Sequence, residues 1–357
     1  MAIDFSVQRY AFFALLAAAL FGASTPFAKL LLGEMSPLVL AGLLYLGSGA
    51  GLAIIAIIRK YFFPNSALSN KEAGLNGIDY AWLGGAVLTG GVAAPILLLW
   101  GLSGTTAAGA SLLLNLESVI TTLVAALFFR EFVARRVWLA SVIMLLAGLM
   151  LVYDPNAAFG FSLKALAVIG ACFMWALDNN LTRNISASDP VAIAMLKGLV
   201  AGGVSLSLAL IAGAPLPHLA AAFGAATLGL FSYGISLVLF VYALRHLGSA
   251  RTGAHFSTGP FFGAMLAILL LGEPLSAEFL IALALMMWAT YLVITEQHGH
   301  EHTHETLAHT HQHLHDEHHQ HEHNGGEDAA PHSHPHVHQP ITHHHPHMPD
   351  IHHRHEH

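Results

Sequence analysis

The chain has 357 residues, of which 55% are hydrophobic and 10% are charged, whereas a soluble domain carries about 25% charged residues. This composition excludes an ordinary soluble enzyme. Lys and Arg (14) are outnumbered by Asp and Glu (21) without any basic patch, which excludes a nucleic-acid-binding protein. Cys172 is the one cysteine, so an intrachain disulfide and a thiolate-rich metal site are also excluded. We therefore expect a polytopic protein of the lipid bilayer.

A helix needs about 20 apolar residues to cross the hydrocarbon core, and ten segments of this chain qualify. In chain order they are 11–32, 37–58, 80–100, 104–129, 136–153, 161–183, 190–213, 219–244, 248–271 and 276–295. Turn residues lie between them, as in the connections from Gly33 to Pro37 and from Gly272 to Pro274. The sequence thus predicts an all-α polytopic membrane protein with ten transmembrane helices.

The basic residues predict the orientation, because Lys and Arg accumulate in cytoplasmic loops. With a cytoplasmic N-terminus, only Lys29 and Lys164 fall near the outer side, and Lys197 lies inside a span. The basic residues that then fall on the cytoplasmic side are Arg9, Arg59, Lys60, Lys71, Arg130, Arg135, Arg136, Arg183, Arg245, Arg251 and Arg354. We therefore expect a multi-pass protein of the cell (inner) membrane with both termini in the cytoplasm.

The membrane body contains an internal repeat. Residues 101–152 align without gaps to residues 243–294, at an offset of 142. Each half holds five predicted spans, an odd number, so the second half is upside down relative to the first. Inverted repeats of this kind are typical of secondary transporters, whose substrate site lies near the midplane between the halves. We predict two five-helix domains, 1–156 and 157–295, followed by a tail, 296–357.

Several short motifs of the body carry a family resemblance. They are Phe21-Gly22-Ala23-Ser24-Thr25-Pro26, Ser36-Pro37, the small-residue stretch from Gly104 to Gly109, and Leu-Leu-Leu-Gly-Glu-Pro-Leu-Ser at 269–276. Over residues 10–295 the sequence resembles the EamA family of the drug/metabolite transporter superfamily. This resemblance implies a ten-helix transporter of small organic metabolites built from two five-helix units. The chain departs from the family pattern at Arg130 and at Leu44-Tyr45, and the basic residue expected near Tyr45 occurs in the second half as Lys197.

Glu117 is the strongest candidate substrate or coupling residue. It lies at the centre of the predicted span 104–129, close to Asn115. A charge inside the hydrocarbon core is costly and is therefore a functional candidate. Glu117 is expected either to bind a cationic substrate or to exchange protons during transport.

Asp178, Asn179, Lys197 and His255 form a second candidate set. All lie near the cytoplasmic ends of their predicted spans, with Asp178, Lys197 and His255 roughly 8–12 Å below the interface at a rise of about 1.5 Å per residue. A structural alternative exists for each: Asp178 and Lys197 form a buried ion pair that joins two helices, and His255 is a packing histidine. Trp100, Trp175 and Tyr233 are interpreted as packing or interface residues.

The tail is acidic, rich in histidine and itself duplicated. It holds 24 of the 27 histidines, and ten acidic residues against one basic residue. Residues 302–323 align with 336–357 at an offset of 34, and eleven of the 22 positions match, nine of them histidines. Its composition predicts disorder.

The spacing of the tail histidines predicts metal binding. In an extended chain the two imidazoles of His-x-His lie on one side and can chelate one ion. Imidazole with occasional carboxylate suits Zn, Ni, Co or Cu(II). The alternative is a cytosolic metal buffer without effect on transport. The predicted ligands are His302, His304, His309, His311, His313, His318, His319, His321, His323, His336, His338, His343, His345, His347, His352, His353, His355 and His357.

Together these features predict a secondary transporter that moves a small solute by alternating access, requires no cofactor and carries a metal-binding tail. No nucleotide-binding loop and no nucleophile–base set is visible, so neither ATP drive nor an enzyme is expected. Two alternatives remain: a transition-metal (Ni, Co or Zn) transporter that uses the tail for delivery, and a membrane-anchored metal sensor or store. The expected partners are the bilayer, a small-molecule or ion substrate and divalent metal ions, and homodimerisation stays open.

Overall fold

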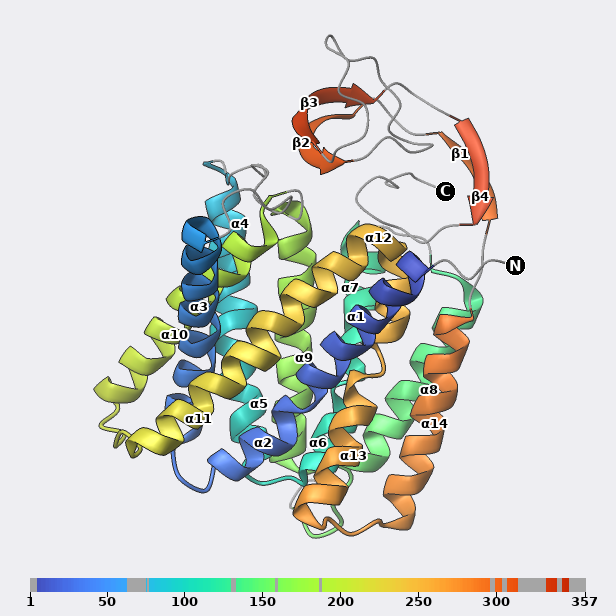
Figure 1. Cartoon of the computed structure of the whole chain (residues 1–357). Coiled ribbons are helices and arrows are strands. Elements are labelled where there is room, and N and C mark those ends of the chain that lie inside the picture. The colour runs from blue at the N-terminus through green and yellow to red at the C-terminus, as the bar shows by residue number, and fades with distance from the viewer. Residues whose placement is uncertain are drawn as a thin grey trace.

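A computed structural model describes residues 5–62, 75, 77–129, 133–157, 160–185, 188–295, 299–303, 307–313, 332–338 and 342–346. Within these residues the membrane body is a bundle of helices, and the tail contributes two short pairs of strands (Figure 1). The predicted all-α membrane body is confirmed.

The first half of the membrane body ends at Val152, the last residue of its final helix. Its helices are α1 (Phe5–Gly22), α2 (Ser24–Leu31), α3 (Pro37–Phe62), α4 (Asp79–Ala86), the π-helix η2 (Val87–Ala93), α5 (Ala94–Leu102), α6 (Ala107–Leu113), α7 (Leu116–Phe129) and α8 (Arg135–Val152).

The second half follows the same pattern. Its helices are α9 (Leu163–Thr182), the 3-10 turn η3 (Arg183–Ile185), α10 (Pro190–Ile211), α11 (Leu219–Gly229), the π-helix η4 (Leu230–Ile235), α12 (Ser236–Phe256), α13 (Gly259–Leu271) and α14 (Ala277–Ile294).

Nine helical segments of the described residues are long and apolar enough to cross a membrane, and α13 adds a shorter apolar helix. The difference from ten predicted spans falls at the ninth, 248–271. There α12 continues through the expected connection to Phe256, and α13 begins at Gly259. The residues around position 246 include no proline, so nothing in them forces the helix to end.

The interruptions of the helices repeat between the two halves. The chain leaves helical order between α6 and α7 at Asn115 and between α12 and α13 at Ser257, which follows Asn115 by the repeat offset of 142. The π-helices η2 and η4 also begin within one residue of this offset. Because π-helical turns are rare, their equivalent positions indicate one backbone design used twice.

Equivalent helices of the two halves pack on each other: α3 packs along α10. A Cβ atom at Gly49 would lie 2.5 Å from the backbone nitrogen of Leu199, and one at Gly198 would lie 2.7 Å from that of Gly49. Glycine therefore permits this backbone approach, as is common between membrane helices. By the same symmetry α1 packs on α12, and α9 on α5.

Local sequence explains several helix ends. The side chains of Thr106, Asp189 and Ser276 accept hydrogen bonds from backbone N–H groups at the starts of α6, α10 and α14. Gly272 ends α13 with a φ of 63°. Figure 1 places the start of α1 and the end of α14 at the same end of the bundle.

Within the tail, whose composition predicts disorder, the structure describes two antiparallel ladders. β1 (Gly299–Thr303) pairs with β4 (Thr342–Pro346), and β2 (Leu307–His313) pairs with β3 (His332–His338). In the second ladder, His309 lies opposite His336, His311 opposite His334, and His313 opposite His332.

Candidate functional site

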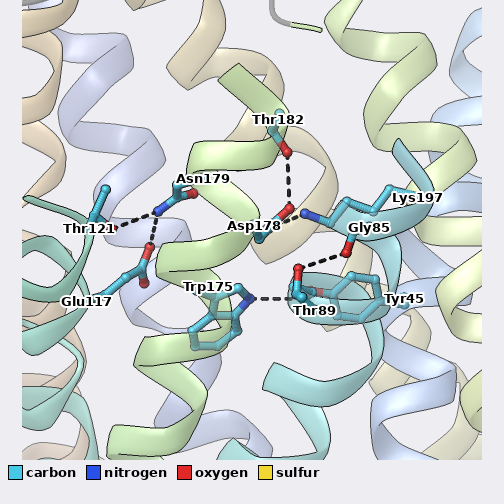
Figure 2. Close-up of polar contacts among 11 residues, drawn as sticks. Tyr45, Gly85, Thr89, Glu117, Thr121, Trp175, Asp178, Asn179, Thr182 and Lys197 are labelled. Carbon is cyan, nitrogen blue, oxygen red and sulfur yellow. Dashed lines mark hydrogen bonds and ion pairs between the residues drawn. The ribbon is translucent and has the colours of Figure 1, made fainter. Parts of the chain in front are cut away.

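Two consecutive residues of α9 organise the polar centre of the bundle. Figure 2 shows Asp178 and Asn179 pointing to opposite sides of this helix. The Asn179 Nδ2 atom donates a hydrogen bond of 2.9 Å to Glu117 Oε1 on α7, and lies 3.4 Å from Thr121 Oγ1. Asp178 forms an ion pair with Lys197 on α10. We call Glu117, Asn179, Asp178 and Lys197 the central site.

The Asp178–Lys197 pair is largely shielded from solvent. The Asp178 side chain is 5% exposed and the Lys197 side chain 16%. Thr182 donates a further hydrogen bond of 3.1 Å from Oγ1 to Asp178 Oδ1. The predicted interhelical ion pair is therefore present in the structure, and it leaves the Lys197 charge already compensated.

Glu117 has no comparable cationic partner among the described residues. The charges of Asp178 and Lys197 both act on Glu117, but its hydrogen-bond partner is the neutral amide of Asn179. Glu117 is half-buried and Asn179 is exposed. A polar pair inside a membrane is expected to face the protein interior or water rather than lipid, so this exposure favours an accessible space beside α9.

An aromatic cluster borders the central site. We define it as Phe21, Tyr45, Trp175, Tyr233 and Phe256. Ring centroids lie 5.4 Å apart for Tyr45 and Tyr233, 5.4 Å for Phe21 and Phe256, 6.0 Å for Phe21 and Tyr233, and 6.4 Å for Phe21 and Trp175. These distances are those of paired aromatic rings. The cluster draws on both halves of the chain.

The π-helix η2 fixes two of these rings. The carbonyl oxygen of Gly90 accepts hydrogen bonds from Tyr45 Oη at 2.7 Å and from Trp175 Nε1 at 3.0 Å. A Cβ atom at Gly90 would lie 2.0 Å from Asp178 Oδ2, so this position needs glycine. The π-helical turn thus brings the backbone against the ion pair and the two rings at once.

The structure separates two predicted residues from the central site. Asn115 is buried and donates from Nδ2 to the Leu112 carbonyl at 3.0 Å, with Met286 Sδ at 3.8 Å. The Asn115 side chain thus forms its hydrogen bond within the interruption between α6 and α7 rather than with Glu117. His255 is half-buried on α12 and has no hydrogen-bond or ion-pair partner for its side chain within the described part of the chain.

The depths of the candidate residues in the membrane also differ from those that the sequence predicts. The sequence placed Glu117 deeper in the membrane than Asp178, yet Asn179, the neighbour of Asp178, bonds Glu117 directly. Packing of α7 against α9 brings the two candidate sets into one site.

The sequence predicts packing or interface roles for Trp175 and Tyr233. It marks Phe21 and Tyr45 only through the family resemblance, and it gives no role to Gly90. One signal was available. The offset of 154 that matches Lys29 with Arg183 in the two halves also matches Phe21 with Trp175. An aromatic ring at equivalent positions of both halves indicates a shared place near the symmetry axis.

The opposite end of the bundle holds a second polar network. Lys29 Nζ donates to the carbonyls of Leu102 and Thr105, both at 2.6 Å. The Glu273 carboxylate accepts from the backbone nitrogens of Ala107 and Ala108 at 2.6 and 2.7 Å. Glu273 belongs to the motif 269–276, so this motif of the second half caps α6 of the first.

The described residues contain no group of three or more His, Cys, Asp and Glu that could hold a metal ion. Of the predicted tail ligands, His302, His309, His311, His313, His336, His338, His343 and His345 lie in the strands. The others lie outside the described residues: His304, His318, His319, His321, His323, His347, His352, His353, His355 and His357.

Comparison with known proteins places the chain among transporters. The model of the EamA-like transporter family matches residues 8–153 and 162–295. The chain is similar to an uncharacterized transporter of Methanothermobacter thermautotrophicus, with 33% identity over 270 residues, 72% of this chain and 77% of that protein. One solved crystal structure is similar over 80% of this chain and 98% of its own, with a TM-score of 0.58 and 18% identity. This last likeness concerns the fold alone.

Proposed function

The chain belongs to the EamA-like transporter family, and we propose that it is a secondary transporter working by alternating access in the cell (inner) membrane. Membership makes it a membrane transporter of a small solute. In the proposed cycle, one inverted half rocks against the other around a binding site that both halves build.

The observation that carries this proposal is the central site. Glu117 comes from the first half, and Asp178, Asn179 and Lys197 come from the second. Residues that carry charge inside a membrane protein mark substrate or ion pathways. Interrupted helices, such as those at Asn115 and Ser257, are also typical of transporters.

Flux through the purified protein tests the proposal. We expect full-length protein in vesicles without nucleotide to move a solute that accumulates, or is depleted, in cells expressing the chain. Glu117→Gln should abolish or strongly reduce this flux, because the change keeps the side-chain volume and removes only the charge. Glu278→Gln on the exposed start of α14 serves as the matched control. Undiminished flux in Glu117→Gln across a range of pH rejects Glu117 as the coupling residue.

We further propose that both termini are cytoplasmic. The start of α1 and the end of α14 share one end of the bundle (Figure 1), and Arg136 Nη1 reaches the carbonyl of Thr295 at 3.4 Å there. The basic bias of the connections supports the cytoplasmic side. A reporter fused after His298 that is active only outside the cytoplasm would contradict this orientation.

The tail is proposed to bind divalent transition metal. The spacing of the tail histidines supports this, because in an extended chain the two imidazoles of His-x-His lie on one side and can chelate one ion. In the backbone register of the ladder of β2 and β3, His309 is paired with His336 and His311 with His334. Zinc and nickel accept such imidazole ligands.

Two alternatives give the metal a different role. In one the chain transports the metal itself, and in the other it is a membrane-anchored sensor or store. The absence of a metal-ligating group among the described residues of the body favours a solute other than metal. Deleting the tail and measuring flux separates the last case, because a store has no flux to lose.

A further inference from the structure

The charges of the central site leave one negative charge without a cation. Lys197 is engaged in an ion pair with Asp178, which also accepts from Thr182. Glu117 accepts from the neutral Asn179 amide. With Glu117 ionised, the described residues of the site carry a net charge of one negative unit, which either a proton or a cationic ligand can compensate.

The aromatic cluster presents ring surface rather than polar groups to this charge. Tyr45 and Trp175 use their O–H and N–H groups on the Gly90 carbonyl. The Tyr233 hydroxyl is hydrogen-bonded with Ser24. Both tyrosines lie within electrostatic range of Glu117. With their polar groups occupied, these residues offer the negative potential of their π-systems.

A carboxylate beside aromatic rings is chemically selective. Rings attract ammonium groups through cation–π interactions and also bury apolar substituents. A divalent metal ion needs several ligating side chains together, and the described residues hold no such group. An anion would meet Glu117 and would find Lys197 already paired. The carboxylate of a zwitterion would face the same two obstacles.

Resting on the transporter function proposed above, we propose that the central site binds an organic ammonium cation. Its positive nitrogen pairs with Glu117, and its hydrophobic substituents lie against the aromatic cluster, in which Phe21 and Trp175 form a repeat-related pair with ring centroids 6.4 Å apart. The ligand class is thus an amine or quaternary ammonium compound that bears at least one apolar group.

Calorimetry with benzyltrimethylammonium on the purified full chain in lipid nanodiscs tests this inference. We expect saturable binding that Glu117→Gln weakens about tenfold or more, while Glu278→Gln leaves it unchanged. Trp175→Leu should weaken binding about three- to thirtyfold, and Trp175→Phe, which keeps a ring, should retain most of it. Trp288→Leu, on the exposed face of α14, is the control for loss of a tryptophan. Glu117→Asp keeps the charge and should bind more tightly than Glu117→Gln, which covers the case of a poorly folded glutamine variant.

Several results overturn the proposal. They are equal affinity in Glu117→Gln, binding of benzoate, benzyl alcohol or phenylalanine as tight as that of the ammonium probe, and Ni²⁺ binding that Glu117→Gln removes. Flux of an anionic solute without ammonium binding overturns this inference and leaves the transporter function intact. Ammonium binding without any flux in vesicles supports the inference and contradicts the transporter function.

Discussion

Asp178 and Asn179 are neighbours in sequence, yet they take part in different interactions. Residue type alone gave the Asp178–Lys197 pair as the alternative to a functional role, because two opposite charges in adjacent spans have few other partners. The Glu117–Asn179 bond was not predictable in this way, since it depends on how far α7 slides along α9. Counting residues from helix ends gives depth to within a turn or two, and the interruption at Asn115 shifts that count.

The ion pair gives a prediction at the residue scale. Asp178→Asn or Lys197→Met alone leaves a shielded charge without its partner, and each should lower the free energy of unfolding by about 3 kcal/mol. The double variant removes both charges and should recover most of that loss. Thermal unfolding of the purified variants in detergent measures the difference. Additive losses in the double variant would show that the two side chains do not stabilise the fold as a pair.

At the scale of elements, the repeated interruptions of the helices shape the site. Apolar length predicted the spans well, but π-helices leave no hydropathy signal, so η2 and η4 could not be foreseen. Glycine pairs were visible at 84–85 and 90–91. Only the structure distinguishes them: Gly90 contacts Asp178, whereas a Cβ atom at Gly84 meets nothing within 4 Å.

This contrast predicts opposite effects for two identical substitutions. Gly90→Ala should lower the free energy of unfolding by about 2 kcal/mol, because the new methyl group overlaps Asp178 and displaces it from Lys197. Gly84→Ala on α4 should be neutral or stabilising by up to about 1 kcal/mol, from helix propensity. Thermal unfolding of the Gly90→Ala and Gly84→Ala variants measures these two effects. Equal effects would mean that η2 relaxes away from Asp178 at little cost.

The motif 269–276 also stabilises a helix, because Glu273 accepts hydrogen bonds at the start of α6. Glu273→Gln removes the negative charge at the start of α6 and weakens two backbone hydrogen bonds, so it should lower the free energy of unfolding by about 1–3 kcal/mol. Glu278→Gln at the exposed start of α14 should lower it by clearly less than Glu273→Gln does. If unfolding shows the same small change in both variants, Glu273 does not hold the two halves together.

At the scale of the whole molecule, the fold was accessible from sequence because hydropathy and the inverted repeat both constrain it. Two halves with odd numbers of spans pack in only a few ways, and the close contact of α3 with α10 follows from their small residues. The aromatic cluster was not accessible, since it joins Phe21, Tyr45, Trp175, Tyr233 and Phe256 from segments far apart in the chain. Such a cluster exists only once the halves have assembled.

The tail and the body give the last prediction. Neutral imidazole binds metal, and free imidazole titrates near pH 6.5, so protonation competes with metal as the pH falls. The full chain should therefore bind zinc or nickel at pH 7.5 and lose most of this affinity by about pH 5. A chain lacking 298–357 should not bind tightly at either pH. Calorimetry on both proteins measures this, and no binding by the full chain at pH 7.5 would end the metal interpretation.

Whether the bound metal affects transport depends on where the tail begins. It follows α14 directly, at the end of the bundle that also holds the start of α1 (Figure 1). Asp178 and Lys197 lie nearer this end than the network of Lys29 and Glu273 does. We therefore expect a metal-loaded tail to act on this end of the bundle, so flux should change with metal in the full chain but not in the truncated one. Strong metal binding with the same flux in both chains would make the tail a buffer beside an independent solute carrier.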